Sequence, residues 1–378
     1  MSFQHYIENG GKRMRCGYTT GTCAALAAAG AARLLLTGKA PENVHLITPK
    51  GLAVEVMPTE YHAEKNWAQC AVQKDAGDDI DATAELLIFA RVAKIQTRTI
   101  TIEGGEGIGR VTKQGLDQPI HAAAINHVPR RMICEAVQRV CAELCYEGGL
   151  SVLIFAPDGA RCAEKTFNAK LGIEGGISIL GTSGIVEPMS LQALIDTKKL
   201  ELHQAASVQT KGILLTPGNY GLDFLQHYTF DGIENVPVVV CSNFIGECLD
   251  TCAAEGFQRV LLVGHIGKFV KLAGGIMNTH SRFADCRTEL FCAHAAICGA
   301  HTALCAALME AATADACIAL LQQAKLWDAV MKSLLMAIET HLVHRAQGRY
   351  VVGAVLFSNA YGLLGETEHV KEIQKAWK

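Results

Sequence analysis

A regular alternation of short apolar runs and helical patterns in the second half of the chain constrains the fold most. Apolar runs occupy residues 213–216, 236–241 and 260–263, and each is followed by a turn and then a helical pattern. Strands that alternate with helices form parallel sheets. We therefore expect a Rossmann-like parallel α/β domain here, followed by a helical C-terminal part over residues 288–346.

The third of these runs ends in residues that favour a ligand site. His265 lies between Gly264 and Gly267, and Lys268 and Lys271 follow. In open α/β sheets ligands bind at the carboxyl ends of the strands, so these residues indicate a site for an anionic substrate. The alternative is an ordinary strand-to-helix turn with a solvated histidine, because a glycine-rich turn alone is weak evidence.

The first part of the chain has a different pattern. Strands are predicted at residues 44–56, 70–74, 85–95 and 99–103, with helices over an alanine-rich run ending at Gly38 and over 129–144. This pattern predicts an α+β domain with an antiparallel sheet. Glycines 148 and 149 mark a plausible boundary, so we expect one domain over residues 1–147 and the other over 148–378.

Two loops of the first domain have residues suited to binding or acid–base chemistry. Thr19, Thr20 and Thr22 stand at the start of the alanine-rich helix, where free N–H groups and the helix dipole form an anion site, or where Thr20 or Thr22 alone caps the helix. Asp75 and Asp78 belong to four carboxylates within residues 75–81. Their repulsion is expected to raise at least one pKa, giving a general base or a cation site, whereas the alternative is a solvated acidic turn.

The glycine-rich loop at residues 104–113 carries two cations, Arg110 and Lys113. No helix follows it, so it lacks the context of a dinucleotide-binding motif. We interpret it as a loop that brings backbone and cationic side chains to an anionic ligand.

Composition excludes several classes of protein. A net charge of −3 gives no case for binding nucleic acid or a membrane surface. Fifteen cysteines, an odd number without a C-x-x-C pair, indicate neither a disulfide framework nor a zinc knuckle, and suit a reducing cytosol. No signal core is present at the N-terminus, and the apolar stretch 23–36 is too short to span a bilayer, so a cytoplasmic protein is expected. Core packing is favoured over metal binding for one set at helical spacing: His294, Cys298, His301 and Cys305.

Taken together, the motifs resemble those of one family, over residues 13–290. The matching segments, in order, are Arg15–Cys23, Lys74–Asp79, Gly105–Lys113, Ala124–Arg130, Lys165–Asn168, Gly175–Met189, Pro217–Gly221, Cys241–Gly246 and Gly264–Lys268, the last continuing to Ser281. The chain resembles the CbiD family, the cobalt-precorrin-5B C1-methyltransferases of anaerobic cobalamin (vitamin B12) biosynthesis. Gln114, His127 and Ala169 stand where the family pattern leads us to expect proline, which affects loop stiffness rather than chemistry.

The resemblance implies methyl transfer from S-adenosyl-L-methionine to C1 of a cobalt-bound, ring-contracted tetrapyrrole, giving cobalt-precorrin-6A. The substrate carries the cobalt, and no metal held by the protein is implied. The chemistry needs in-line approach and exclusion of water more than acid–base catalysis. The substrate bears many carboxylates, so we assign its binding to cations and helix or loop termini: Thr19, Thr20, Thr22, Arg110, Lys113, Lys268, Lys271, Asn278 and His280.

The methyl donor is expected at the strand ends of the second domain. The candidate residues are Gly218, Asn219, Tyr220 and Gly221, then Ser242 and Asn243, where an acid would usually bind the ribose. Glu247 or Asp223 is the substitute for that acid. The catalytic candidates are His265, as a proton acceptor or a hydrogen-bonding group near the reacting carbon, and Asp75 or Asp78 as a base.

Two other functions remain open at this point. One is a non-catalytic protein that binds a corrinoid intermediate of the same pathway. The other is a different α/β enzyme acting on a polyanion, such as a kinase-like protein, although the absence of G-x-x-x-x-G-K-[ST] argues against it. A homo-oligomer is also left open.

Overall fold

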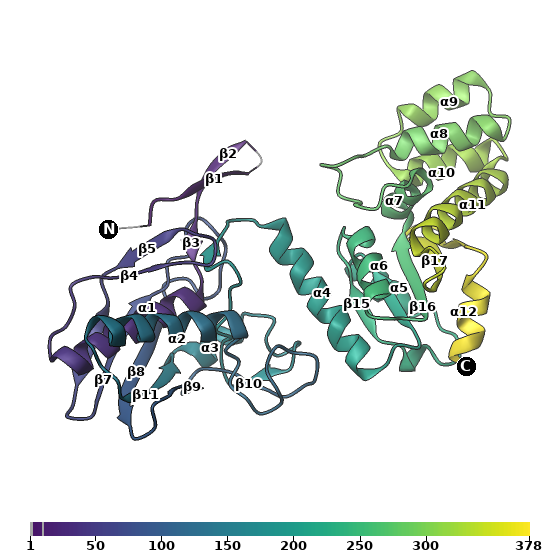
Figure 1. Cartoon of the computed structure of the whole chain (residues 1–378). Helices are drawn as coiled ribbons and strands as arrows, with labels where there is room; N and C mark the ends of the chain where they lie inside the picture. The colour runs from purple at the N-terminus through teal and green to yellow at the C-terminus, as the bar shows by residue number, and fades with distance from the viewer. Residues whose placement is uncertain (1–2, 10) are drawn as a thin grey trace. The chain divides into compact units, whose positions relative to one another are not determined.

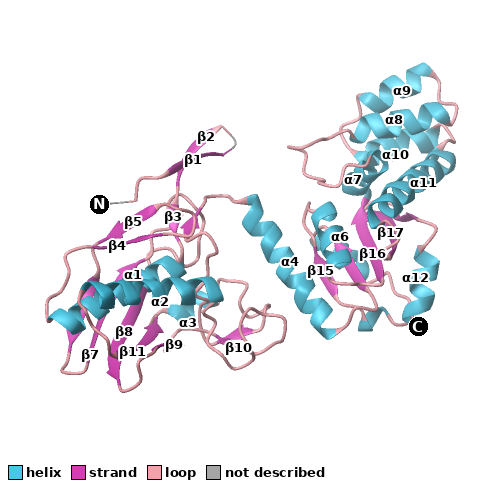
Figure 2. Cartoon of the chain, in the orientation of Figure 1, coloured by secondary structure: helices cyan, strands magenta, loops and turns pink. Residues whose placement is uncertain are grey.

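A computed structural model describes residues 3–9 and 11–378 and divides the chain into two compact units (Figure 1). Unit 1 spans Met1–Leu191, and unit 2 spans Gln192–Lys378. Both units combine helices with sheets, so the protein belongs to the mixed α/β class (Figure 2).

The main sheet of unit 1 has five strands in the order β6-β7-β8-β11-β9. The strands are β6 (Thr59–Ala63), β7 (Trp67–Gln73), β8 (Leu87–Ile95), β11 (Gly149–Phe155) and β9 (Ile100–Gly104). Neighbouring strands are antiparallel except for β11 and β9, which are parallel. The sheet is therefore mixed, with one parallel pair where an antiparallel sheet was expected.

The expected boundary at residue 147 is wrong, because β11 is an interior strand of this sheet. Val152 of β11 stands opposite Val92 of β8 on one side and Ile102 of β9 on the other. A cut before Gly149 would remove the strand that joins β8 to β9. The chain instead passes to unit 2 at Leu191.

Two helices pack together on unit 1: α1 (Thr20–Thr37) and α2 (His127–Glu143). Alanine is the most frequent residue of α1, and its small side chain allows close approach to β7, β8 and α2. At 18 residues the helix is long and apolar enough to cross a membrane, so the expectation of a stretch too short to do so is wrong. Yet 83% of it is buried within the protein, as in the core helix of a soluble protein. It ends at Gly38, which adopts φ 72° and donates its N–H to the carbonyl of Leu34.

Short elements complete unit 1. They are β1 (Tyr6–Asn9), β2 (Lys12–Arg15), β3 (Gly17–Tyr18), β4 (Val44–Ile47), β5 (Ala53–Val56), β10 (Arg110–Val111), β12 (Ile173–Glu174), β13 (Ile185–Val186) and helix α3 (Gly159–Ala163). The pair β3–β13 is important for the site, because it joins the start of the chain to residues about 170 positions later.

Unit 2 is built on a second five-stranded sheet in the order β15-β14-β16-β17-β18. The strands are β14 (Ile213–Thr216), β15 (Val238–Val240), β16 (Arg259–His265), β17 (Val351–Ser358) and β18 (Gly362–Glu366). β15, β14, β16 and β17 run parallel to one another, and β18 is an antiparallel edge strand next to β17. The alternation of apolar runs therefore correctly predicted the parallel pairing of β14, β15 and β16.

Helices surround this sheet and extend beyond it. They are α4 (Leu191–Val208), α5 (Asn219–Leu225), α6 (Ile245–Ala254), α7 (Ile266–Phe269), α8 (Arg287–Ile297), α9 (Thr302–Met309), α10 (Ala314–Gln323), α11 (Trp327–Ala346) and α12 (Val370–Trp377), with 3-10 turns η1 (Ile233–Asn235) and η2 (Val270–Gly274).

The histidines and cysteines at helical spacing belong to two helices, since Gly299 at φ 91° separates α8 from α9. His294 hydrogen bonds with Ser333 at 2.8 Å, and His301 caps α9 by accepting from the N–H of Leu304 at 3.1 Å. Within residues 3–9 and 11–378, no three His, Cys, Asp or Glu side chains are grouped as a metal would require.

Candidate functional site

The parallel strands of unit 2 bring several predicted residues to one edge of the sheet. The carboxyl ends of β14, β15, β16 and β17 lie at the same edge because the four strands run in the same direction. The segments that leave this edge contain Tyr220, Ser242, His265 and Ser358. This is where open α/β sheets bind their ligands.

His265 is the last residue of β16 and caps α7. Its Nδ1 accepts the N–H of Gly267 at 3.1 Å. Burial lowers the pKa of His265, and the opposing effect of Asp315 is smaller. A neutral imidazole whose Nδ1 accepts a hydrogen bond carries its proton on Nε2. His265 therefore presents an N–H donor, so of the two roles expected for it, hydrogen bonding fits this geometry and proton acceptance does not.

Aromatic rings flank His265 on two sides. The ring centroid of Tyr220 lies 6.3 Å away, and that of Phe357 lies 5.6 Å away with the two rings nearly perpendicular. Tyr220 is 65% exposed, so most of its ring is free to contact a ligand. Just before it, the position that a side chain would occupy at Gly218 is open space. Gly221 differs, since a Cβ there would collide with the hydroxyl of Thr216.

The two lysines after His265 have different environments. Lys271 is buried and donates to the carbonyls of Thr279 and Ala284, at 3.1 and 2.8 Å. Lys268 is half-buried, and burial lowers its pKa, with Lys271 acting in the same direction. No carboxylate in residues 3–9 or 11–378 pairs with Lys268. Lys271 thus holds the following loop in place, and Lys268 keeps its charge available for an anion.

Residues 276–280 are joined to the end of β15 by hydrogen bonds. The N–H of Thr279 donates to the carbonyl of Asn243 at 3.0 Å, and its hydroxyl donates to Asn243 Oδ1 at 3.2 Å. Asn278 Oδ1 accepts the N–H of His280 at 3.1 Å. The amides of Asn243 and Asn278 therefore shape these loops. Of the other two candidates in this region, Glu247 lies in the first turn of α6 and Ser242 adopts φ 56°.

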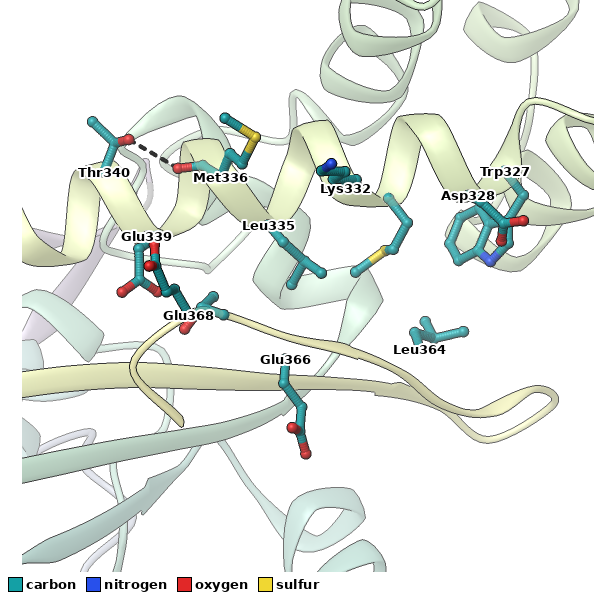
Figure 3. Close-up of a pocket in the computed structure, with 12 residues that line it drawn as sticks. Trp327, Asp328, Lys332, Leu335, Met336, Glu339, Thr340, Leu364, Glu366 and Glu368 are labelled. Carbon is teal, nitrogen blue, oxygen red and sulfur yellow. Dashed lines mark hydrogen bonds between the residues drawn. The ribbon is translucent and has the colours of Figure 1, made fainter. Parts of the chain in front are cut away.

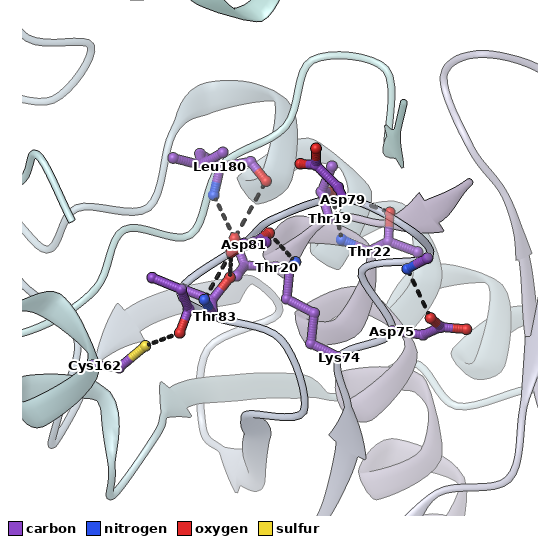
Figure 4. A network of polar contacts seen from close by, with 12 residues as sticks. Thr19, Thr20, Thr22, Lys74, Asp75, Asp79, Asp81, Thr83, Cys162 and Leu180 are labelled. Carbon is purple, nitrogen blue, oxygen red and sulfur yellow. Dashed lines mark hydrogen bonds and ion pairs between the residues drawn. The ribbon is translucent and has the colours of Figure 1, made fainter. Parts of the chain in front are cut away.

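The threonines of unit 1 are placed differently from the anion site that was expected (Figure 4). Thr20 and Thr22 are buried, and the hydroxyl of Thr22 donates to the carbonyl of Gly184 at 2.6 Å. Thr20 Oγ1 accepts the N–H of Leu180 at 3.0 Å. Thr19 Oγ1 caps α1 by accepting the N–H of Thr22 at 3.3 Å. Thr20 and Thr22 thus hydrogen bond to the loop at residues 178–184, and the residue that caps the helix is Thr19, whereas Thr20 or Thr22 was expected.

The carboxylates of the acidic loop also form ion pairs and hydrogen bonds within unit 1. Asp75 forms a two-pronged ion pair with Arg15, at 2.5 and 2.8 Å, and Asp78 Oδ2 accepts the N–H of Arg15 at 2.6 Å. Burial alone would raise the pKa of Asp75, but hydrogen bonds from Arg15 and Gly77 outweigh it and the net shift is downward. The expectation of a raised pKa is therefore wrong for Asp75, and a carboxylate of lowered pKa is a weak base.

A buried ion pair joins the two ends of the same loop, residues 74 and 81 (Figure 4). Lys74 is 3% exposed and pairs with Asp81. Asp81 also accepts the N–H and hydroxyl of Thr83, at 2.7 and 2.6 Å. Burial would raise the pKa of Asp81, but Lys74 and Thr83 lower it overall.

Arg110 and Lys113 remain at the surface of unit 1. Arg110 pairs with Glu103 at 2.8 Å and donates to the carbonyl of Gly104 at 2.7 Å. Lys113 Nζ donates to the carbonyl of Lys170 at 3.3 Å. Lys113 therefore carries the less compensated charge of the two.

Two residues of the strand-end site were missed in the sequence. Ser358 ends β17, and its hydroxyl donates to Asp315 of α10 at 2.8 Å. Ser358 directly follows the apolar run of residues 350–357, so its position was a usable signal. Asp315 lies in a helix 43 residues earlier, and no local pattern connects it to this edge.

A mostly parallel sheet with polar and aromatic side chains gathered at its strand ends makes unit 2 an α/β unit with a candidate ligand site at that edge. Two family models match the chain: CbiD over residues 7–188, and the CbiD C-terminal domain over residues 278–368. A protein of Ruminiclostridium cellulolyticum named cobalt-precorrin-5B C(1)-methyltransferase is 44% identical over 382 residues, which is 98% of each chain. The chain belongs to the CbiD family.

A second curated relative agrees with this assignment. A Treponema denticola protein of the same name is 40% identical, over 96% of this chain and 100% of its own. Among solved structures, the crystal structure of the cobalamin biosynthesis protein (cbiD) from Archaeoglobus fulgidus is 31% identical. That match covers 75% of this chain and 87% of the other, with a TM-score of 0.40.

Proposed function

We propose that this protein is a methyltransferase that methylates C1 of cobalt-precorrin-5B, with S-adenosyl-L-methionine as methyl donor and cobalt-precorrin-6A as product. The observation that carries this proposal is 44% identity, over nearly the whole of both chains, to a protein named for that reaction. The strand-end site of unit 2 supports it, because two large ligands need positioning more than they need acid–base catalysis.

The methyl donor is assigned to the carboxyl edge of a Rossmann-like sheet in unit 2. Open space at Gly218 and the exposed ring of Tyr220 fit a flat, uncharged adenine next to a close backbone. Glu247 lies in the first turn of α6, directly after the Ser242–Asn243 strand end, and supplies the carboxylate that a ribose needs. When bound, the donor supplies an electrophilic methyl group on a sulfonium.

The protein's own groups then hold and orient the tetrapyrrole. Lys268 has an unpaired charge at the strand end, which complements a substrate carboxylate. His265 donates a hydrogen bond from Nε2 to an acceptor on the macrocycle, and its neutral form avoids placing a cation beside the sulfonium. The assignment of Lys113 and Arg110 of unit 1 to substrate binding stays a prediction.

Calorimetry separates this function from the alternative of a non-catalytic corrinoid-binding protein. S-adenosyl-L-methionine is titrated into the full chain with and without tetrapyrrole, and transfer of a labelled methyl group is followed in parallel. The expected result is saturable binding of the donor and label in the tetrapyrrole. Tetrapyrrole binding without donor binding or label would overturn the enzymatic proposal and support the binding protein.

Substitution tests the donor site itself. Tyr220→Ala is expected to weaken donor binding about tenfold, as expected for loss of a stacked ring. The matched control is Tyr361→Ala, since Tyr361 is also partly exposed but lies in the turn between β17 and β18. Equal effects of the two substitutions would remove Tyr220 from the donor site.

A further inference from the structure

We propose that a cavity at the C-terminal end of α11 in unit 2 binds a peripheral carboxylate of the tetrapyrrole substrate. The proposal rests on the proposed function, which makes the substrate a polycarboxylate. The cavity has a volume of about 390 Å³, and its lining includes His341, His344, Arg345, Arg349 and Asp250. Volumes of this size accommodate part of a large ligand.

One arginine of the cavity is already neutralised. Arg345 pairs with Asp250 through Nε at 3.1 Å and Nη2 at 2.7 Å. Its Nε also approaches the carbonyl of Gly246 at 3.2 Å, which fastens α11 to the first turn of α6. This pair therefore builds the wall of the cavity and contributes little net charge.

The other arginine is not neutralised. Arg349 donates to the carbonyls of Ala346 and Arg345, both at 3.2 Å, so it is held in place by backbone at the end of α11. No carboxylate in the described part of the chain pairs with it. A guanidinium that is positioned and unpaired suits a carboxylate, which it can bind by charge-assisted hydrogen bonds.

Two histidines add hydrogen-bond donors beside Arg349. Neither His341 nor His344 has a hydrogen-bond or ion-pair partner among residues 3–9 and 11–378. Each neutral imidazole carries one N–H. A Cβ at Gly275, which adopts φ 73°, would lie 3.2 Å from the His341 ring, so the small residue leaves room for this ring in the cavity.

Charge, rather than size, singles out this cavity. A larger one of about 550 Å³ lies earlier along α11, between that helix and β18 (Figure 3). Its lining has four carboxylates, on Asp328, Glu339, Glu366 and Glu368, against one cation on Lys332. A polycarboxylate is repelled there.

The basic cavity is also connected to the strand-end site. Met277 of its lining accepts the N–H of Gly246 through its carbonyl at 3.1 Å, and two residues later Thr279 is bonded to Asn243. The cavity wall and the end of β15 thus belong to one hydrogen-bonded structure within unit 2. A macrocycle with carboxylates on its rim can be held at the strand ends while one carboxylate occupies the cavity.

The test compares two cobalt corrins that differ only in charge: cobyrinic acid, with free carboxylates, and its fully esterified form. Arg349→Gln in the full chain is expected to weaken binding of the free acid about tenfold, as for loss of a charged hydrogen bond. Binding of the ester and of S-adenosyl-L-methionine should not change. Arg349→Lys should retain most of the affinity, and the double variant His341→Gln/His344→Gln should lose about threefold.

Lys332→Gln is the matched control, because it removes the same charge from the acidic cavity. Unchanged affinity of Arg349→Gln and of the double histidine variant would overturn the inference while leaving the proposed function intact. An equal loss in Arg349→Gln and Arg349→Lys, for acid and ester alike, would also overturn it, as a structural effect. Failure of the unmodified protein to bind the free acid would overturn the proposed function as well.

Discussion

The buried pair of Lys74 and Asp81 allows a quantitative test of what holds the acidic loop of unit 1. The Lys74 side chain is 2% exposed and that of Asp81 is 22% exposed. Replacing Lys74 by Met keeps the apolar stem but leaves the carboxylate without its cation. Removing one partner of a buried pair costs about 3–5 kcal/mol. Thr83 still donates twice to Asp81, so we expect about 3 kcal/mol for Lys74→Met.

A double-mutant cycle gives the sharper result. Asp81→Asn leaves the ammonium of Lys74 buried and uncompensated, which is expected to cost a similar amount. In Lys74→Met/Asp81→Asn neither charge is left unpaired, so the combined cost should be smaller than the sum by about 2 kcal/mol. A loss of about 3 kcal/mol in a unit of this size lowers Tm by roughly 6–12 °C.

The assay must report on unit 1 alone. The chain has three tryptophans, of which Trp67 lies on β7 of unit 1, whereas Trp327 and Trp377 lie in unit 2. In a Trp327→Phe/Trp377→Phe background, urea unfolding followed by fluorescence therefore measures unit 1. Single substitutions that each cost less than 1 kcal/mol, or strictly additive costs, would refute the argument that the pair is buried and coupled.

Three further outcomes are expected. Thr20→Val removes the acceptor of the Leu180 N–H and should lower the free energy of unfolding of unit 1 by about 1–2 kcal/mol in the same assay; an unchanged value would contradict the loop contact. Because the pKa of Asp75 is lower in the folded protein, its stabilisation is present above its unfolded pKa of about 3.9 and is lost as the pH falls through the lower folded pKa. Asp75→Asn should therefore cost stability at neutral pH and progressively less at acidic pH, measured by urea titration at each pH. His265→Ala should reduce single-turnover methylation about two- to tenfold and His265→Gln should restore most of it, since a glutamine amide replaces the Nε2 donor; an unchanged rate in both would remove His265 from the reaction.

The parallel sheet of unit 2 was predictable because its signals are local. Each buried strand is a short apolar run with a turn after it, and parallel pairing follows from the intervening helices. For the same reason the strand-end residues Tyr220 and His265 were found from the sequence. Asp315 was not, because it reaches the same edge from α10 through packing alone.

The boundary of unit 1 was missed because glycine occurs both in flexible linkers and where two backbone segments approach closely. Gly148 and Gly149 have the composition of a linker, yet a Cβ at Gly149 would lie 1.6 Å from the carbonyl oxygen of Thr97. Glycine is needed there so that β11 can begin against the neighbouring backbone. Composition alone does not distinguish a glycine needed for close backbone approach from a glycine of a flexible linker.

The threonines and the acidic loop show the same limit for site residues. Thr22 and Asp75 have the residue types of an anion site and a base, and which role they take depends on their partners. Those partners are Gly184, 162 residues later, and Arg15, 60 residues earlier. Partners at such separations are determined by the tertiary fold, and the neighbouring residues in the sequence do not indicate them.

The joining of β3 to β13 has a consequence for synthesis of the protein. Unit 1 is complete only when Ile185 and Val186 can pair with Tyr18 and Gly17. At about 5–20 residues per second, the ribosome takes roughly 8–30 s to pass from α1 to that point. During this interval the alanine- and leucine-rich α1 lacks its final cover at the N-terminus. The nascent chain is therefore open to chaperones, or to aggregation, at this apolar helix.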